Sequence, residues 1–521
     1  MNETLEKKCR LFQSIIWDRQ KEYYTKKGLK AWNPDETPEF ISSNAYTAQY
    51  YAKLINELLH DLDSDSKETF YILDLGSGSG CFAYHFLKAM EENPPKQRIM
   101  YVLADYSQAN LDTHLKNPLF KHWIESGSCD VACVNLLNPI ESITLQHHKK
   151  NITPNDITQP LIAIANYLFC SLPVDFLELD DDHVRLAEST ITKPINSKDY
   201  RRASIKLNYK RPLTDSDLPT ANHFNHALFK GNDYPCRVAM PSAAFQIMDE
   251  LQRFSNGRLA LFCSDIATDD PKEALSPRSV SFQTKDGNLW MGLDISTFHH
   301  WNQQNGWEEV FFEPCLHFFT ACFSTGIPSN ALTSLNAFAS RKEPYTTPLA
   351  MTQMLFGRDQ TPCTLLKALD TFAFNPHLLV RDKKALLTFT EHLPYFKKQL
   401  KQLLHKHHAD VYFHGAIKDE ANQVLASLFY AVKDFKKANE YYNHSHLSPL
   451  DATDYRKYHH AQQLSGQPRK KGLTWRYLRS QLLAPVEWAV TWWKSKRMKP
   501  STIYASVTLI AIVVFLLLHM R

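Results

Sequence analysis

The sequence is poor in glycine, with 15 glycines among 521 residues. This is about 3 per cent, against roughly 7 per cent in an average protein. Three of them, Gly76, Gly78 and Gly80, nevertheless fall within five positions, directly after the apolar run 70–75. Because glycine lets other atoms approach the backbone closely, we expect this stretch to form a ligand-binding loop.

Signals for a secreted or metal-stabilised protein are also missing. Ten cysteines in 521 residues are too few for a disulfide framework. Cys129 and Cys133 do not form a CxxC pair, so we predict no metal site. The N-terminal sequence MNETLEKKCRLFQSIIWDRQ lacks the apolar core of a secretory signal. These absences predict a body with free thiols that faces the cytosol.

Several nucleotide-binding patterns are absent from the glycine-rich stretch. The dinucleotide pattern GxGxxG would need a glycine where the chain has Cys81, and the pattern GxxxxGK[ST] of phosphate-binding loops does not occur there. What is present is Asp74-x-Gly76-x-Gly78-x-Gly80. An acidic residue at the end of a strand, followed by alternating glycines and a helix, still predicts a ligand-binding loop, because a helix N-terminus offers free amides to a ligand.

Charge is unevenly distributed along the chain. The net charge is +4, yet residues 466–499 hold nine lysines and arginines against Glu487 alone, which leaves the body mildly acidic. Residues 501–518 follow without any charge and are long enough, at about 27 Å, to cross a thin bilayer as a helix. The basic flank predicts a single-pass C-terminal anchor at 500–521, with the body on the cytoplasmic side. Membrane lipid is therefore an expected partner.

The apolar pattern predicts the fold class. Short apolar runs at 70–75, 98–104, 129–136, 160–167 and 258–264 alternate with helical patterns, which predicts an α/β fold with a doubly wound parallel sheet. Two further runs within 308–324 suit a terminal antiparallel pair. The expected domains are an N-terminal helical cap (1–67), the α/β domain (68–328) with an insertion at 176–235, a helical module (329–464), a basic, tryptophan-rich interfacial segment (465–499) and the anchor (500–521).

The glycine loop resembles motif I of class I S-adenosylmethionine-dependent methyltransferases, which have a Rossmann-like sheet. The resemblance implies S-adenosylmethionine as cofactor, with Asp74, Gly76, Gly78 and Gly80 in the binding loop. It also implies that Asp105, at the end of the second strand, accepts hydrogen bonds from the ribose hydroxyls. Asn135, after the third strand, is expected near the adenine. Helix capping by Asp105 is an alternative, and the two roles can coexist.

The segment ANYLFCSLPVD (165–175) marks the edge where a methyl acceptor would lie. It resembles the MidA-like methyltransferases, which methylate a protein arginine, and more closely a group of uncharacterised bacterial methyltransferase-like proteins with a C-terminal tetratricopeptide-like region. The resemblance implies catalytic roles for Asn166, Tyr167 and Asp175. Cys170 departs from it, because that group has an aspartate there, and cysteine is a poorer base. The positions that carry the closer resemblance are Ala31-Trp32, Pro38, Ile41, Ser43-Asn44, Ala48, Tyr51-Ala52, 82–87, Asn166-Tyr167, Phe169, Ser171, Pro173 and Asp175.

Two functional hypotheses follow. The first is a membrane-tethered methyltransferase that acts on a protein, with the helical module holding the acceptor; residues 425–449 resemble one tetratricopeptide unit, although a plain helical hairpin fits equally. The second is a degenerate methyltransferase fold that serves as an interaction scaffold, which the departure at Cys170 favours. A nucleic-acid substrate is not expected, because the [DN]PP[YFW] signature is missing and the body is acidic.

Overall fold

The structure is a computed structural model of the chain. It divides into two compact units, the first formed by Met1–Asn375 with His414–Ala416 and the second by Pro376–Phe413 with Ile417–Arg521. The residues that it describes are 2–32, 42–62, 68–179, 183–213, 236–268, 286–289, 291–315, 318–340, 361–412, 417–445 and 452–465.

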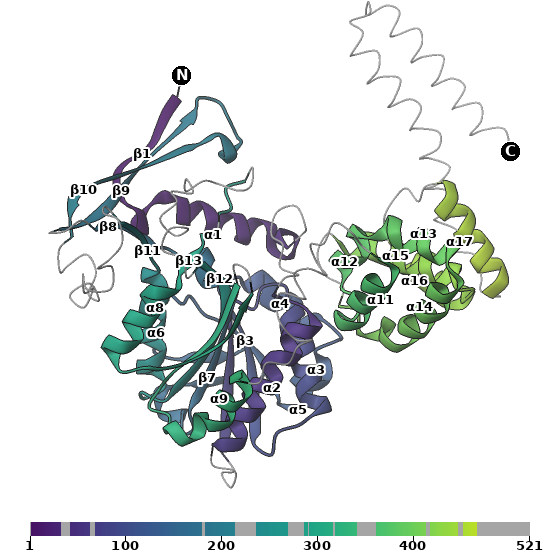
Figure 1. Cartoon of the computed structure of the whole chain (residues 1–521), viewed down its shortest axis with the longest axis horizontal. Helices are drawn as coiled ribbons and strands as arrows, with labels where there is room; N and C mark the ends of the chain where they lie inside the picture. The colour runs from purple at the N-terminus through teal and green to yellow at the C-terminus, as the bar shows by residue number, and fades with distance from the viewer. Residues whose placement is uncertain are drawn as a thin grey trace, which may run out of the picture. The chain divides into compact units, whose positions relative to one another are not determined.

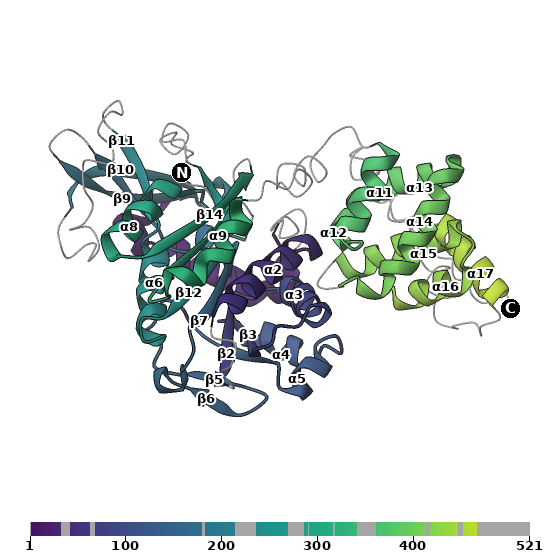
Figure 2. The same cartoon turned by 60° about the horizontal axis from the view of Figure 1, so that its bottom comes forward.

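A parallel sheet forms the centre of the first unit (Figures 1 and 2). Its long parallel strands are β2 (Thr69–Leu75), β3 (Arg98–Asp105), β4 (Cys129–Cys133), β7 (Leu161–Asn166) and β12 (Leu259–Thr268), and the short strand β13 (Leu293–Asp294) pairs parallel with the end of β12. Nearly every residue of β2 and β7 is buried, as expected where helices cover both faces of a parallel sheet. The predicted strands are therefore confirmed to within a few residues.

Two antiparallel strands complete this sheet at one side. β15 (Phe318–Thr325) pairs antiparallel with β12, and β14 (Glu308–Cys315) lies outside it. The predicted terminal pair is confirmed. The strand order is β14-β15-β12-β7-β2-β3-β4. From β2, the chain adds β3 and β4 on one side of the sheet and then β7 and β12 on the other, so the strand order reverses between β2 and β7. In doubly wound sheets, ligands bind at the carboxyl ends of the strands beside such a reversal.

Helices pack on both faces of the sheet (Figure 2). On one face, Tyr51 of α2 (Ala45–Asp61) meets Phe82 of α3 (Cys81–Glu92) edge to face, with ring centroids 5.2 Å apart. On the other face, the rings of Phe245 and Phe298 lie 5.3 Å apart and belong to the sheet's main apolar cluster. The remaining helices of the first unit are α1 (Ile15–Lys27), α4 (Gln108–Lys116), α5 (Lys121–Ser126), α6 (Ser242–Phe254), α8 (Ile295–Asn305), α9 (Thr333–Ser340) and α11 (Pro362–Thr371).

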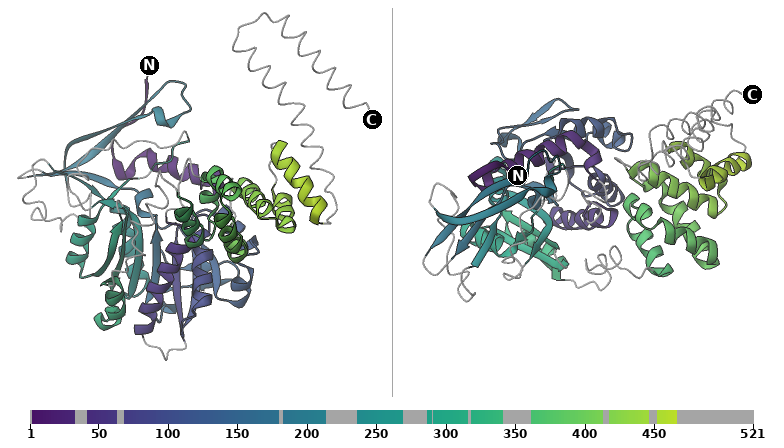
Figure 3. Two further views of the ribbon diagram at one scale, coloured as in Figure 1. Left: turned by 45° about the vertical axis from the view of Figure 1, so that its right-hand side comes forward. Right: turned by 90° about the horizontal axis from the view of Figure 1, so that it is seen from above.

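A second sheet joins the N-terminus to the insertion (Figure 3). Its strands are β1 (Asn2–Arg10), β8 (Asp175–Leu179), β9 (Val184–Pro194), β10 (Ser204–Pro212) and β11 (Cys236–Met240). The prediction of a helical cap at 1–67 thus differs from the structure at β1, which is a strand. The segment NETLEKKCR has no apolar alternation, and its partner β9 lies more than 170 residues away, so no local pattern indicated a strand.

The second unit is helical in its described residues. It contains α12 (Pro376–Arg381), α13 (Lys383–His392), α14 (Pro394–His407), α15 (Lys418–Ala431), α16 (Phe435–His444) and α17 (Ala452–Ser465). Helices α15 and α16 form the predicted hairpin, in which the rings of Phe429 and Tyr441 stack with centroids 5.4 Å apart. The resemblance of this hairpin to a tetratricopeptide unit stays a prediction.

The predicted C-terminal transmembrane helix requires a correction. Across the described ranges, which end at 465, no helix has both the length and the apolar character needed to cross a bilayer. The predicted anchor itself, 500–521, and the basic segment 466–499 lie outside the described residues. The described residues accordingly form a Rossmann-like α/β domain with a helical region. They contain no transmembrane helix, so they give the predicted single-pass localisation no support.

Candidate active site

The glycine loop begins where β2 ends. Gly76, Gly78 and Gly80 have φ angles of +66°, +54° and +79°, a region that side chains with a Cβ rarely adopt. The amides of Gly76 and Ser77 donate to the Ala104 carbonyl at 2.8 and 3.1 Å, which fixes the loop to β3. Gly80 caps α3. The sequence therefore needs glycine at all three positions for backbone reasons alone.

Neighbouring side chains fill the space beside two of these glycines. A Cβ on Gly76 would lie 2.9 Å from Leu168 Cδ1, and a Cβ on Gly78 would lie 2.8 Å from Trp32 Cζ2. Both distances are shorter than van der Waals contact. The loop is thus packed between the residues that follow β7 and the N-terminal segment, and any side chain here would displace that packing.

Asp105 connects the glycine loop to the end of β3. Its Oδ2 accepts from the Gly78 amide at 3.1 Å and its Oδ1 from the Ser107 amide at 2.8 Å. Burial raises the pKa of this carboxyl, while the two amides oppose the rise. Each carboxylate oxygen can accept a further hydrogen bond. Its position is therefore compatible with ribose binding. The capping alternative is not supported, because the N-cap of α4 is Ser107.

A cavity of about 390 Å³ opens at the carboxyl ends of the strands. Its volume lies in the range usual for small-molecule sites. The residues that line it are Trp17, Asp18, Gln20, Lys21, Tyr24, Trp32, Ser43, Gly76, Ser77, Gly78, Ser79, Asp105, Tyr106, Asn110, Val134, Asn135, Leu136, Leu137, Asn138, Asn166, Tyr167, Leu168, Ser171, Leu172 and Pro173. The cavity therefore lies at the reversal of strand order between β2 and β7.

The end of β7 contributes Asn166 to the lining of the cavity. Asn166 Nδ2 donates to the Ser42 carbonyl at 3.0 Å, which orients the amide. Its Oδ1 is buried and has no hydrogen-bond partner within the described residues. Tyr167 follows with a φ of +56°, which is unusual for a bulky residue and costs about 1 to 3 kcal/mol. Strain of this kind, next to a buried acceptor without a partner, is typical of a functional site.

The N-terminal segment covers the cavity, in line with the predicted N-terminal helical cap, although no sequence pattern indicated which of its side chains line the cavity. Gln20 of α1 donates from Nε2 to the Ser171 carbonyl at 2.7 Å. Glu6 of β1 holds the start of α1, since its Oε2 accepts from the Ile15 amide at 2.8 Å. The side chains that this segment adds to the lining include Trp17, Gln20, Tyr24 and Trp32. Within this segment, the only positions that the sequence analysis had singled out were Ala31 and Trp32, which belong to the resemblance to the bacterial methyltransferase-like proteins.

The cavity brings together six of the nine predicted site residues. They are Gly76, Gly78, Asp105, Asn135, Asn166 and Tyr167. Gly80 instead serves as the N-cap of α3. Asp74 is buried beneath the loop, where burial and the charge of Asp105 raise the pKa of its carboxyl to about 7. Asp74 is therefore a buried residue near the end of β2 and does not line the cavity.

Asp175 is the predicted catalytic residue that the structure places elsewhere. It is fully buried, and its two oxygens accept from Arg10 Nε and Nη2 at 2.9 and 2.5 Å. Ser242 Oγ also donates to it at 2.8 Å. A carboxylate with these partners anchors β1 to β8, and its position does not support the predicted role in proton transfer.

Cys170 also lies away from the cavity lining. Its side chain is fully buried, and its amide donates to Asp265 Oδ2 at 3.0 Å. Burial and the neighbouring Asp265 raise the pKa of the thiol. Burial likewise raises the pKa of Asp265, to about 6. An aspartate at position 170 would therefore meet Asp265 under the loop and not a substrate, so the idea that the site has lost a catalytic carboxylate here is not supported.

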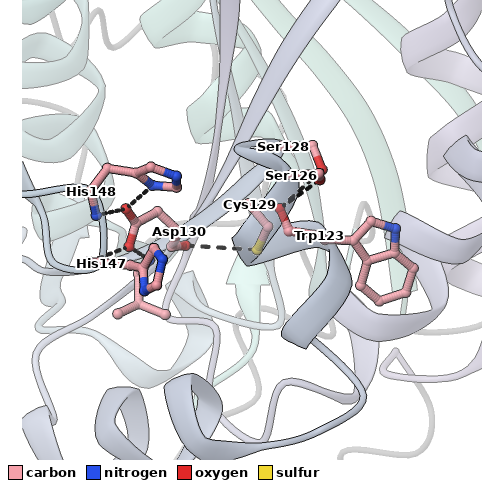
Figure 4. A network of polar contacts seen from close by, with 8 residues as sticks. Trp123, Ser126, Ser128, Cys129, Asp130, His147 and His148 are labelled. Atoms are coloured by element: carbon pink, nitrogen blue, oxygen red, sulfur yellow. Dashed lines mark hydrogen bonds and ion pairs between the residues drawn. The ribbon is translucent and has the colours of Figure 1, made fainter.

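A separate polar cluster lies near the start of β4 (Figure 4). Buried Asp130 accepts from the amides of His147 and His148, both at 2.9 Å, and contacts His148 Nδ1 at 2.6 Å. These three side chains do not line the cavity. The carboxylate fixes the turn that leads out of β5 (Ile143–Leu145). In the part of the chain that the structure describes, no group of three or more metal-ligating side chains could hold an ion.

The cavity fits the cofactor that the resemblance implies. S-adenosylmethionine has ribose hydroxyls that need acceptors, an ammonium group that needs further acceptors, and a flat adenine that needs apolar walls. Asp105 provides an acceptor for the ribose hydroxyls. The Gln20 side-chain carbonyl oxygen, which is buried and has no hydrogen-bond partner within the described residues, suits the ammonium group. Val134 and Leu136 contribute apolar lining beyond Asp105.

Sequence comparison supports the same cofactor. Residues 51–275, less than half of the chain, match the sequence model of a family described as "Putative S-adenosyl-L-methionine-dependent methyltransferase". The match runs from α2 to beyond β12, and so includes the glycine loop, Asp105 and Asn166. It supports the predicted methyltransferase activity and the predicted cofactor for this region. A search of curated proteins finds no match to the chain.

Solved structures show weaker similarity. A protein from Burkholderia thailandensis, crystallised with S-adenosyl-homocysteine, is 11% identical, with 56% of this chain and 80% of that chain covered and a TM-score of 0.38. A native structure from the same superfamily and organism is 11% identical, with 62% and 94% covered and a TM-score of 0.36. The DhpI-SAM-HEP complex is 10% identical, with 59% and 97% covered and a TM-score of 0.29. Scores this low do not establish a common fold, so the family match to residues 51–275 is the similarity that bears on function.

Proposed function

We propose that the chain is an S-adenosylmethionine-dependent methyltransferase that binds its cofactor in the cavity and methylates a protein. The observation that carries the proposal is the junction of the glycine loop and Asp105. The Gly78 amide and the Asp105 carboxylate are joined at 3.1 Å inside a 390 Å³ cavity, at the reversal of strand order.

The residues of the cavity divide into two groups. Asp105 and Asn135 lie at the ends of β3 and β4 and would hold the nucleoside. Asn166 lies at the end of β7, where its buried Oδ1 would accept a hydrogen bond from the methyl acceptor and orient it. When bound, S-adenosylmethionine supplies an electrophilic methyl group on a good leaving group. Alignment is therefore the main contribution required of the protein.

The second part of the proposal is that the methyl acceptor is a protein. It is supported by the resemblance of residues 165–175 to the MidA-like methyltransferases and by the α15–α16 hairpin, which resembles a tetratricopeptide unit. The scaffold alternative relied on the departure at Cys170. Because the Cys170 thiol is buried against Asp265 and does not line the cavity, that argument no longer favours a scaffold.

Transfer of a radiolabelled methyl group to lysate proteins tests the proposal. The full-length chain should label a protein band that protease removes and nuclease does not. Asn166→Ala should lower labelling at least tenfold while S-adenosylhomocysteine still binds, because the acceptor loses its hydrogen bond. Asp112→Asn, on the exposed side of α4, is the matched control. Normal cofactor binding without any labelling would favour the scaffold and contradict the proposal.

A further inference from the structure

Trp32 lies against the glycine loop. A Cβ added to Gly78 would stand 2.8, 3.1 and 3.3 Å from three atoms of its indole. Tyr24 also packs against the indole, with ring centroids 5.6 Å apart. The turn at Gly28, with a φ of +52°, ends α1 and directs the chain towards Trp32. The ring is therefore held in place and lines the cavity.

The strand order indicates which part of the cofactor would lie beside Trp32. The strands run β7-β2-β3-β4, so the loop after β2 lies between Asn166 on one side and Asp105 on the other. If Asp105 holds the ribose and Asn166 orients the acceptor, the methyl-bearing sulfur belongs between them, above the glycine loop. Trp32 covers this loop at Gly78.

The sulfur changes its charge during the reaction. Transfer of the methyl group breaks the carbon–sulfur bond and leaves its electron pair on sulfur. The positive charge passes to the acceptor, which then releases a proton to solvent. The product is a neutral thioether. Tryptophan is the aromatic side chain whose face attracts a cation most strongly.

We propose that Trp32 is a cofactor-binding residue whose indole favours the sulfonium of S-adenosylmethionine over the neutral thioether of S-adenosylhomocysteine. This inference rests on the proposed function. It assigns a role to the Ala31-Trp32 pair, which lies outside the matched region 51–275. It also means that the N-terminal segment helps to release product, since the attraction ends when the charge is lost.

Calorimetry with both ligands tests this role in the full-length protein. Trp32→Leu removes the π face and should weaken S-adenosylmethionine about 2- to 30-fold more than S-adenosylhomocysteine. Trp32→Phe keeps a weaker aromatic face and should give an intermediate ratio. Trp17→Leu is the matched control, because Trp17 lines the same cavity from α1 without contacting the glycine loop in this way. It should change both affinities by the same factor.

The outcomes separate the inference from the proposed function. Equal weakening of both ligands by Trp32→Leu would mean that Trp32 only packs the loop, and would contradict the inference alone. A wild-type protein that binds neither ligand would contradict the proposed function and the inference together. Should Trp32→Leu fail to fold, as judged by circular dichroism, the Trp32→Phe ratio decides: an unchanged ratio contradicts the inference and a reduced ratio supports it.

Discussion

The floor and the roof of the cavity are built in different ways. The floor consists of the loops that follow β2, β3, β4 and β7, and each loop continues directly from a buried strand. The roof is the segment 17–32, which contains most of α1. Contacts with residues far away in the sequence hold this segment in place. Gln20, for example, bonds to Ser171 across 151 positions. The floor thus depends on local backbone geometry, while the roof depends on long-range anchors.

The anchor of the roof should produce the largest effect. Arg10→Ala leaves Asp175 buried without its cation, and we expect a loss of about 3 to 5 kcal/mol in the free energy of unfolding. Urea denaturation measures it. The double variant Arg10→Met/Asp175→Asn removes both charges and should recover most of the loss. Lys26→Ala, which breaks an exposed pair with Glu22, should change stability much less. A double variant no better than Arg10→Ala would show that packing, and not charge, anchors the roof.

Cys170→Asp tests whether the side chain at position 170 is buried against Asp265 below the cavity floor. A second carboxyl beside Asp265 would be buried in the place of a thiol, so we expect a loss of roughly 2 to 4 kcal/mol in the free energy of unfolding. Cys170→Ser, which adds no carboxyl, serves as the control and should lose less. A stable Cys170→Asp protein with raised methyl transfer would contradict the burial of this side chain and restore the catalytic interpretation.

Gly78→Val tests the contact between floor and roof. Valine would be strained at a φ of +54° and would collide with Trp32, so we expect the Kd for S-adenosylhomocysteine to rise about 100-fold. Gly306→Val is matched in backbone strain, with a φ of +68°, but nothing lies within 4 Å of its Cβ. It should lose stability without losing affinity. Equal affinities in the two variants would mean that the loop does not bind the cofactor.

Asp74→Asn should alter the dependence of stability on pH. The native pKa of about 7 lies above the ordinary value of 3.8, so the native state holds a proton that the unfolded state has released. This stabilisation is complete below about pH 4 and is lost as the pH rises through 7. Relative to Asp74→Asn, the wild type should lose up to about 1.4 kcal/mol per pH unit in that window. Parallel stability curves would contradict the burial of this carboxyl.

The same contrast explains what could be read from the sequence. The glycine loop, Asp105 and Asn166 were predictable because each lies within a few residues of an apolar strand. Asp175 also follows such a run, but its distance from the cavity depends on Arg10, more than 160 residues away. Trp17 and Gln20 gave no local signal, since their pattern is that of any amphipathic helix. Cys170 was misread because sequence does not show which way a side chain points.

Binding of S-adenosylhomocysteine to the full-length protein, measured by calorimetry, tests the central claim most directly. The account predicts one site per chain, competition with S-adenosylmethionine, and at least a tenfold loss of affinity in Asp105→Ala but not in Asp112→Asn. A folded wild-type protein that releases no heat with either ligand, or an Asp105→Ala variant that binds as tightly as the wild type, would contradict the assignment of the cavity as the cofactor site.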